Sequence, residues 1–227
     1  MLMVTDLTQR SYAERKGSVI HKPLRTPMIL ILIVGLSLTG CAEIAYERLN
    51  DPSRDTWQKP QGVIDKLSIA PGSRVADLGA GGGYFTWHLA KAVGPRGTVY
   101  AVDINKAALD MIFKEMVARG TPNVRPVRAQ PNDPQLPEPV DLVFSCNAYH
   151  QIVDRETYFH SLASSLRPGG RVAILDFQPR GFFSGMFGHR ITKEDVRLEM
   201  EAAGYRLVDD FDLIDQQHFQ IFEMAKV

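Results

Sequence analysis

The feature that most constrains the fold is a glycine-rich segment between two apolar ones. Residues 79–83, Gly-Ala-Gly-Gly-Gly, place four glycines in five positions between a strand-like run at 74–78 and a helix-like window at 84–93. Glycine at a strand-to-helix turn permits a sharp bend, a positive φ and close approach of the backbone to a ligand. The segment therefore predicts an α/β fold with a binding turn, although a tight turn without a ligand has the same sequence signature.

The spacing of these glycines argues against two common classes of phosphate-binding loop. The dinucleotide fingerprint needs glycine three residues after Gly81, where Tyr84 stands, and the segment lacks the Lys-Ser or Lys-Thr ending of a P-loop. About 20 residues past Gly83, a second apolar run ends in Asp103, where a carboxylate can accept hydrogen bonds from ribose hydroxyls. The alternative for Asp103 is a turn or a helix N-cap. The combination favours a ligand without phosphates that lies against bare backbone.

From Pro60 onward, β-branched runs alternate with amphipathic windows, which is typical of a parallel sheet with crossover helices. The pattern predicts an α/β, Rossmann-like, doubly wound sheet of seven mostly parallel strands with an antiparallel last strand. The predicted strands are residues 74–78, 97–103, 124–128, 140–146, 171–177, 205–211 and 218–224, and the predicted helices are residues 61–68, 84–93, 106–119, 155–166 and 192–203.

Four segments carry a family resemblance: VADLGAGGG, YAVD, VDLVF and LRPGGR. They resemble, in the same order, the signature segments of class I S-adenosylmethionine (SAM) dependent methyltransferases, and the similarity covers residues 57–227. WQKP at 57–60 and EAAGY at 201–205 also resemble a small bacterial subgroup of that family. The resemblance implies an enzyme that transfers a methyl group from the cofactor SAM to a small-molecule or lipid-like acceptor.

The resemblance also assigns residues to the cofactor. It implies that Asp77 orients the loop or the SAM amine, and that Asp103 binds the ribose. The remaining implied cofactor-binding residues are Gly79, Ala80, Gly81 and Gly83 in the loop, Ile104 and the pair Asn132 and Asp133 at the adenine, and Asn147 between SAM and substrate. For Asp133 a turn in a proline-rich loop is an equal alternative, and Ile104 is equally natural as an apolar residue at a helix start.

Catalytic candidates follow the fourth predicted strand, where the crevice of such a sheet opens. Tyr149 could line the methyl pocket, and His150 could act as a base or orient a substrate. The competing interpretation is that both residues start and pack the next helix. Residues 179–189, PRGFFSGMFGH, predict a lid over an apolar acceptor, a loop that contacts a membrane, or packing over the sheet edge.

Composition narrows the range of partners. The chain has 26 basic and 26 acidic residues and no basic stripe, so we expect no nucleic-acid partner. Its two cysteines, Cys41 and Cys146, are too few for a four-thiolate metal site, and no metal site is expected.

The first 41 residues have the features of a signal segment. A run of apolar and small residues after Pro27 ends at Cys41 and follows the basic residues Arg15, Lys16, Lys22 and Arg25. Its last four residues, LTGC, resemble the lipobox of bacterial lipoproteins. The resemblance implies that Cys41 is acylated and anchors the protein to a membrane of the cell envelope; a cytoplasmic location is the alternative. Residues 1–41 are thus expected to be a signal and lipobox segment, 42–59 a tether with a short helical stretch, and 60–227 the methyltransferase domain. Because SAM is made in the cytosol, the alternative function is a non-catalytic lipoprotein that binds a ligand or partner through the same fold.

Overall fold

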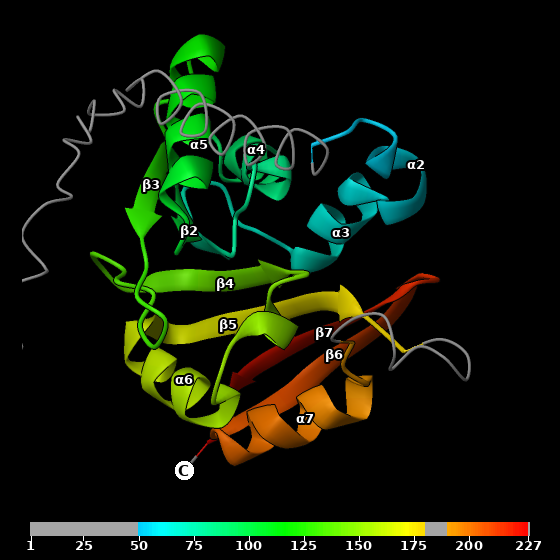
Figure 1. Ribbon diagram of the computed structural model, residues 1–227. Coiled ribbons are helices and arrows are strands. Elements are labelled where there is room, and N and C mark those ends of the chain that lie inside the picture. The colour runs from blue at the N-terminus through cyan, green and yellow to red at the C-terminus, as the bar shows by residue number, and fades with distance from the viewer. Residues whose placement is uncertain (1–49, 180–189, 227) are drawn as a thin grey trace, which may run out of the picture. The chain divides into compact units, whose positions relative to one another are not determined.

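The computed structural model describes residues 50–179 and 190–226, which all belong to the second of two units, Met1–Leu38 and Thr39–Val227 (Figure 1). The expected signal segment with Cys41 and residues 180–189 of the expected lid at 179–189 lie outside the described residues. Within the described ranges, no helix has the length and apolar character needed to cross a membrane.

Seven strands form one sheet in the order β3-β2-β1-β4-β5-β7-β6. β7 is antiparallel to both of its neighbours, and the other pairs are parallel, which confirms the predicted fold class. The strands are β1 (Arg74–Leu78), β2 (Thr98–Asp103), β3 (Val124–Arg128), β4 (Val140–Cys146), β5 (Leu166–Phe177), β6 (Tyr205–Ile214) and β7 (Gln217–Met224).

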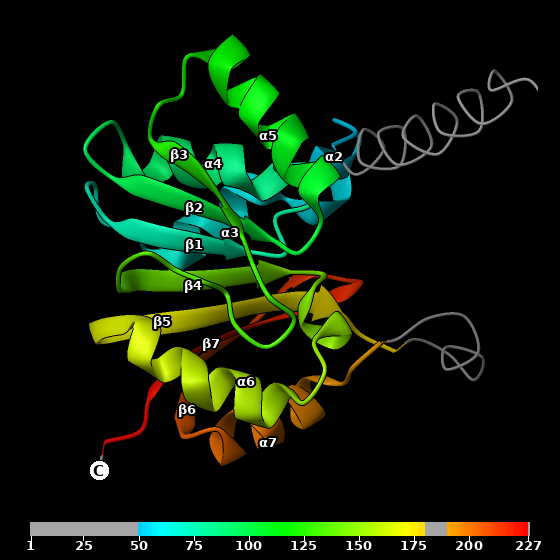
Figure 2. The same cartoon turned by 60° about the vertical axis from the view of Figure 1, so that its left-hand side comes forward.

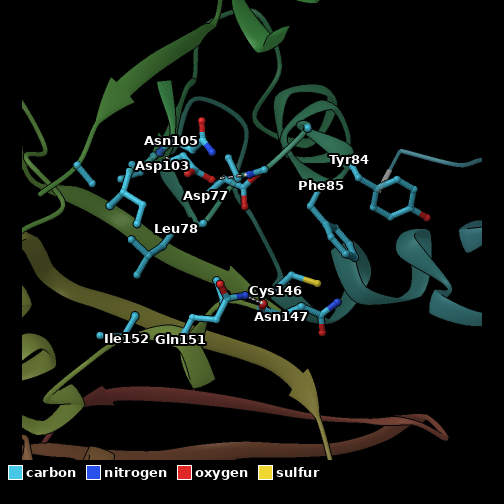
Figure 3. Close-up of a pocket in the computed structure, with 18 of the residues that line it drawn as sticks. Asp77, Leu78, Tyr84, Phe85, Asp103, Asn105, Cys146, Asn147, Gln151 and Ile152 are labelled. Carbon is cyan, nitrogen blue, oxygen red and sulfur yellow. Dashed lines mark hydrogen bonds between the residues drawn. The ribbon is translucent and has the colours of Figure 1, made fainter. Parts of the chain in front are cut away.

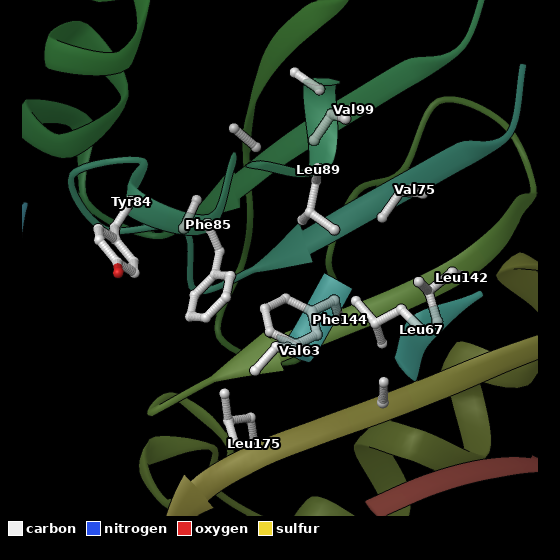
Figure 4. Close-up of a cluster of buried hydrophobic side chains, with 14 of the residues drawn as sticks. Val63, Leu67, Val75, Tyr84, Phe85, Leu89, Val99, Leu142, Phe144 and Leu175 are labelled. Carbon is white, nitrogen blue, oxygen red and sulfur yellow. The ribbon is translucent and has the colours of Figure 1, made fainter. Parts of the chain in front are cut away.

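Helices cover both faces of this sheet (Figures 1 and 2). α3 (Pro60–Leu67), α4 (Tyr84–Val93) and α5 (Lys106–Arg119) pack on one face, and α6 (Arg155–Leu162) and α7 (Lys193–Ala202) pack on the other. The alternation of side chains along each strand produces the two cores: in β4, Leu142 and Phe144 enter the first, whereas Val143 enters the second. Figure 4 shows the first core, where Val63 and Leu67 of α3 lie near Phe144.

Two element boundaries differ from the predicted ones by more than three residues. The helix predicted to reach residue 166 ends at Leu162 and continues as the 3₁₀ turn η2 (Ala163–Ser165), where the Ser164 hydroxyl donates to the Ser161 carbonyl. Serine competes for backbone groups in this way, and the approaching Pro168 disfavours further helix. β5 starts five residues earlier than predicted, because Leu166 already pairs with Val140; the register then shifts so that residues 167–170 lie opposite the single residue Asp141.

A further short helix, α2 (Arg54–Gln58), lies within the segment expected to be a tether. Its Gln58 side chain is fully buried, and its Trp57 ring stacks 6.1 Å from the ring of Phe177 at the end of β5. α2 therefore packs at the edge of the sheet formed by the carboxyl ends of its parallel strands.

Candidate functional site

A cavity of about 610 Å³ opens at the carboxyl ends of β1, β2 and β4 (Figure 3). It is lined by the glycine loop, the end of β2, the segments that follow β3 and β4, and α2. The strand order reverses between β1 and β4, and ligands of doubly wound sheets bind at such a switch point. The loop singled out in the sequence therefore lies where this fold places its ligand.

The glycine loop owes its shape to backbone contacts that side chains would prevent. Gly79 and Ala80 both donate their N–H groups to the carbonyl of Val102, at 2.9 and 3.0 Å, which ties the loop to β2. At φ +78°, a Cβ atom on Gly79 would lie 2.2 Å from the Cβ of Ala148 in the segment after β4. Glycine is required here because the two walls of the cavity touch at this point.

Asp103 lies at the end of β2 and faces the loop. Its Oδ2 accepts the N–H of Gly81 at 2.9 Å, and its Oδ1 accepts the N–H of Asn105 at 2.8 Å. Asn105 is the N-cap of α5, with its side chain accepting from the N–H of Ala107. The helix-cap role that was the alternative for Asp103 thus belongs to Asn105, and the Asp103 carboxylate lines the cavity.

Asp77 is the second carboxyl at the cavity and is almost wholly buried in β1. Thr86 of α4 donates its hydroxyl to Asp77 Oδ2 at 2.6 Å. Burial raises the pKa of Asp77 from 3.8 to about 7, and the charge of Asp103 adds to that increase, while the Thr86 hydrogen bond and Arg54 oppose it. The site therefore combines bare loop backbone with two carboxyls in different environments.

Comparison with known proteins identifies this arrangement. Residues 75–170 match the family model described as "Methyltransferase domain". The fold resembles the crystal structure of a SAM-dependent methyltransferase from Aquifex aeolicus with a TM-score of 0.72 and 23% identity, covering 80% of this chain and 97% of that one. Residues 75–170 therefore match a methyltransferase domain, and the fold is that of a SAM-dependent methyltransferase. SAM is the cofactor of this class of enzyme.

Two curated relatives of the methyltransferase domain act on different acceptors by their names. The ubiquinone/menaquinone biosynthesis C-methyltransferase UbiE of Vibrio vulnificus is 31% identical over 154 residues, which cover 63% of this chain and 58% of that protein. The arsenite methyltransferase of Halobacterium salinarum is 28% identical over 165 residues, which cover 70% of this chain and 40% of that protein. The chain thus spans less than two thirds of the length of these relatives.

At the far end of the cavity of the methyltransferase domain, the lining comes from Ile104 and from the backbone region after β3. Ile104 is 58% exposed at the cavity wall, and Gln130 and Pro131 also line it. Asn132 and Asp133 do not belong to the described lining. Asp133 instead closes a turn, pairing its backbone with that of Gln130 and accepting the N–H of Gln135 at 2.7 Å. The positions after β3 that reach the cavity are therefore Ala129, Gln130 and Pro131.

Of the residues after β4, Cys146 and Asn147 line the cavity, whereas Tyr149 and His150 do not belong to its described lining. Tyr149 lies in the 3₁₀ turn η1 (Tyr149–Gln151), is fully buried against Phe159, and donates its hydroxyl to Glu199 of α7 at 2.7 Å. The His150 Nδ1 lies 2.8 Å from Asp176 Oδ1. The tight turn directs both side chains toward α6, α7 and β5, so their geometry matches the packing interpretation.

Four residues at or beside the cavity escaped the sequence reasoning. Asn50 and Arg54 line the wall on the α2 side, and Asn50 donates its amide to the carbonyl of Gly82 at 2.5 Å. Gln58 and Gln217 lie fully buried directly behind this wall. For Gln58, the sequence signal was the resemblance of residues 57–60 to a methyltransferase subgroup. That resemblance includes Gln58 but does not indicate which residue it contacts.

Proposed function

We propose that this protein catalyses transfer of a methyl group from SAM to a small-molecule or lipid-like acceptor. The observation that carries the proposal is the convergence of the Asp103 carboxylate and the glycine-loop backbone on one cavity. In this proposal Asp103 binds the ribose, the loop 79–83 accommodates the methionine portion, and Asp77 attracts the ammonium group of SAM. Ile104 covers the adenine, whose edge Gln130 approaches, and Asn147 lies at the methyl end.

The chemistry makes few demands beyond those the cavity meets. A sulfonium is an excellent leaving group, so the enzyme needs mainly to align the acceptor and exclude water. Tyr84, Phe85 and Cys146 supply apolar wall surface beside Asn147. Burial raises the pKa of the Cys146 thiol, so this group stays protonated and serves as wall surface.

A small-molecule acceptor agrees with the names of both curated relatives, a quinone-biosynthesis C-methyltransferase and an arsenite methyltransferase. The domain retains a single cysteine, Cys146, and its thiol is engaged by Gln58 at 3.2 Å. Binding of a soft metalloid by several thiolates is therefore not supported, and an organic acceptor fits the apolar wall better.

Calorimetry with S-adenosylhomocysteine, the demethylated product of SAM, tests the proposal. Asp103→Ala removes the ribose acceptor and is expected to weaken binding by about 10- to 100-fold, as for lost hydrogen bonds to a charged group. Asp110→Ala, which removes an exposed carboxylate of α5 paired with Lys106, is the matched control and should bind like the wild type. Absence of wild-type binding at millimolar ligand would exclude the enzyme and its cofactor together. Cofactor binding without methyl transfer to any acceptor would favour the non-catalytic alternative.

We further propose that the protein is a lipoprotein of the bacterial envelope, anchored through acylated Cys41. The support is the basic flank, the apolar run and the LTGC tetrapeptide in the sequence. Mass spectrometry of the protein purified from membranes should give a chain that begins at Cys41 and carries acyl groups. An intact N-terminus with an unmodified Cys41 thiol would instead support the cytoplasmic alternative.

A further inference from the structure

A chain of side-chain hydrogen bonds runs behind the α2 wall of the cavity. The Nε and Nη2 groups of Arg54 donate to Gln58 Oε1 at 2.9 and 2.6 Å. Gln58 Nε2 donates to Gln217 Oε1 at 3.0 Å, and Gln217 Nε2 donates to Asn147 Oδ1 at 2.5 Å. The chain joins α2 to the first residue of β7 and to the residue that follows β4.

The order of donors and acceptors fixes which way each amide faces. Gln58 and Gln217 are 0% and 1% exposed, so water does not compete for their polar atoms. Each uses its carbonyl oxygen and its amide nitrogen within the chain, and Gln58 Nε2 also donates to Cys146 Sγ. Because the side-chain oxygen of Asn147 accepts the hydrogen bond from Gln217, its amide nitrogen is the group that can donate into the cavity.

The two ends of this chain line the cavity, and both present donors. A guanidinium has only donor groups, and Arg54 also lies 3.9 Å over the ring of Tyr84. In Figure 3 the side-chain nitrogen of Asn147 points to the side of the cavity where Cys146 and Phe85 lie, and its oxygen points away. The carboxyls Asp77 and Asp103 lie on the glycine-loop side of the same cavity. The cavity is therefore polarised, with the acidic groups Asp77 and Asp103 near the loop and the cationic Arg54 near α2.

We propose that Arg54 and Asn147 form a binding subsite for an oxygen anion, and that the buried Gln58–Gln217 pair positions both of them. The inference rests on the proposed function and deepens it. The anion is either the carboxylate of the SAM amino-acid group or an anionic oxygen of the acceptor, because both offer acceptor atoms to the N–H groups of Arg54 and Asn147. Gln58 and Gln217 touch no ligand and act as positioning residues.

Two nucleosides separate these sources in calorimetry on the full chain. S-adenosylhomocysteine carries the amino-acid carboxylate, whereas methylthioadenosine lacks it. If the subsite binds the cofactor carboxylate, Arg54→Met and Asn147→Asp each weaken S-adenosylhomocysteine at least about 10-fold and leave methylthioadenosine unchanged. If it binds the acceptor, both nucleosides keep their affinity, and benzoate binds the S-adenosylhomocysteine complex of the wild type but not that of either variant.

Arg119→Met removes a surface guanidinium that lies over Trp87 and serves as the control for lost cation–ring packing.

Gln217→Glu tests the positioning role. An ionised carboxyl still accepts from Gln58 but cannot donate to Asn147, whose amide then turns its oxygen into the cavity. Relative to the wild type at the same pH, binding of the anion-bearing ligand is expected to fall at least about 10-fold at pH 8 and to recover at low pH, where the protonated carboxyl donates again. Gln220→Glu adds a carboxyl to the same strand on the opposite face, where Gln220 is equally buried, and controls for the buried charge. Gln217→Met, which removes the donor without adding charge, replaces this variant if it does not fold.

The outcomes distinguish this inference from the proposed function. If the wild type binds neither nucleoside, the proposed function fails, and the inference fails with it. If both nucleosides bind, no variant changes either affinity, and benzoate does not bind, then the oxygen-anion subsite alone is overturned. Equal pH profiles for Gln217→Glu and Gln220→Glu would overturn the positioning role of the glutamine pair.

Discussion

At the scale of single residues, Asp77 shows how burial makes a carboxyl responsive near neutral pH. The surrounding strands exclude water from it, and its pKa rises to about 7, although Thr86 donates a hydrogen bond and Arg54 contributes a positive charge. Because this pKa is raised above 3.8, the protonated form stabilises the fold. That contribution is complete below about pH 4 and is lost as the pH rises through about 7.

The same titration should appear in ligand binding. Below pH 7 the free protein holds a proton on Asp77, and a ligand ammonium placed beside it would lower its pKa and displace that proton. We therefore expect S-adenosylhomocysteine to release up to about one proton at pH 6, and its affinity to rise between pH 6 and pH 7.5. Calorimetry in two buffers with different ionisation enthalpies measures the release, and Asp77→Asn should abolish it. Identical heats in both buffers for the wild type would contradict the assignment of the ammonium to Asp77.

The residue-level signals that sequence reasoning used were local in the chain. Gly79 directly follows one predicted strand and Asp103 ends another, so the rule that parallel strands end at one edge of the sheet was enough to bring them together. The contact between Gly79 and Ala148 joins positions 69 residues apart and depends on how closely β1 and β4 approach. No spacing rule predicts such a contact.

At the scale of elements, α2 is the part of the site that sequence reasoning described as a tether. Its five residues, RDTWQ, are too few and too polar to show the apolar periodicity that identifies a buried helix. What buries Gln58 is a partner far along the chain, Gln217, which supplies a hydrogen bond instead of apolar surface. A polar residue that is buried by tertiary pairing leaves little trace in a hydrophobic pattern.

Removal of α2 should therefore damage the fold as well as the site. A chain that begins at Pro60 leaves Gln217 and Cys146 without Gln58 and uncovers the Phe177 ring on which Trp57 stacks. We expect a loss of about 2–4 kcal/mol in the free energy of unfolding relative to a chain that begins at Asn50. Urea denaturation of the two chains measures the difference. Equal unfolding midpoints would mean that α2 is dispensable to the fold.

Elements near the acceptor side were the hardest to place from sequence. Tyr149 and His150 follow a strand whose end could be predicted, but the direction of their side chains depends on a 3₁₀ turn three residues long. That turn places Tyr149 against Phe159 and under Glu199, contacts that come from α6 and α7. Side-chain direction after a strand is set by packing that the local sequence does not encode.

At the scale of the whole molecule, the fold was largely predictable because strand-like and helix-like patterns of apolar residues alternate along the chain from Pro60 onward. The bounds of β1, α4, α5, β3 and β4 agree with the predicted ones, since each has a clear apolar pattern and a glycine, proline or polar stop. The differences lie where irregular structure adds residues, as at the register shift between β4 and β5. The part of the site that follows from the geometry of the fold, such as Gly79 and Asp103, was predictable. The part that depends on a hydrogen bond between distant residues, such as Gln58 and Gln217, was not.

The hydrogen-bond chain from Arg54 to Asn147 has a consequence for when the protein acquires its site. Gln217 lies 70 residues after Asn147 in the chain, so it leaves the ribosome after β4, β5 and β6. Domains fold as they emerge, from the N-terminus onward, yet Asn147 cannot receive its buried partner until β7 joins the sheet between β5 and β6. The ligand-ready cavity thus forms only after β7 has emerged, and a translation product that stops short of β7 would have the glycine loop without the buried support of the wall that faces it.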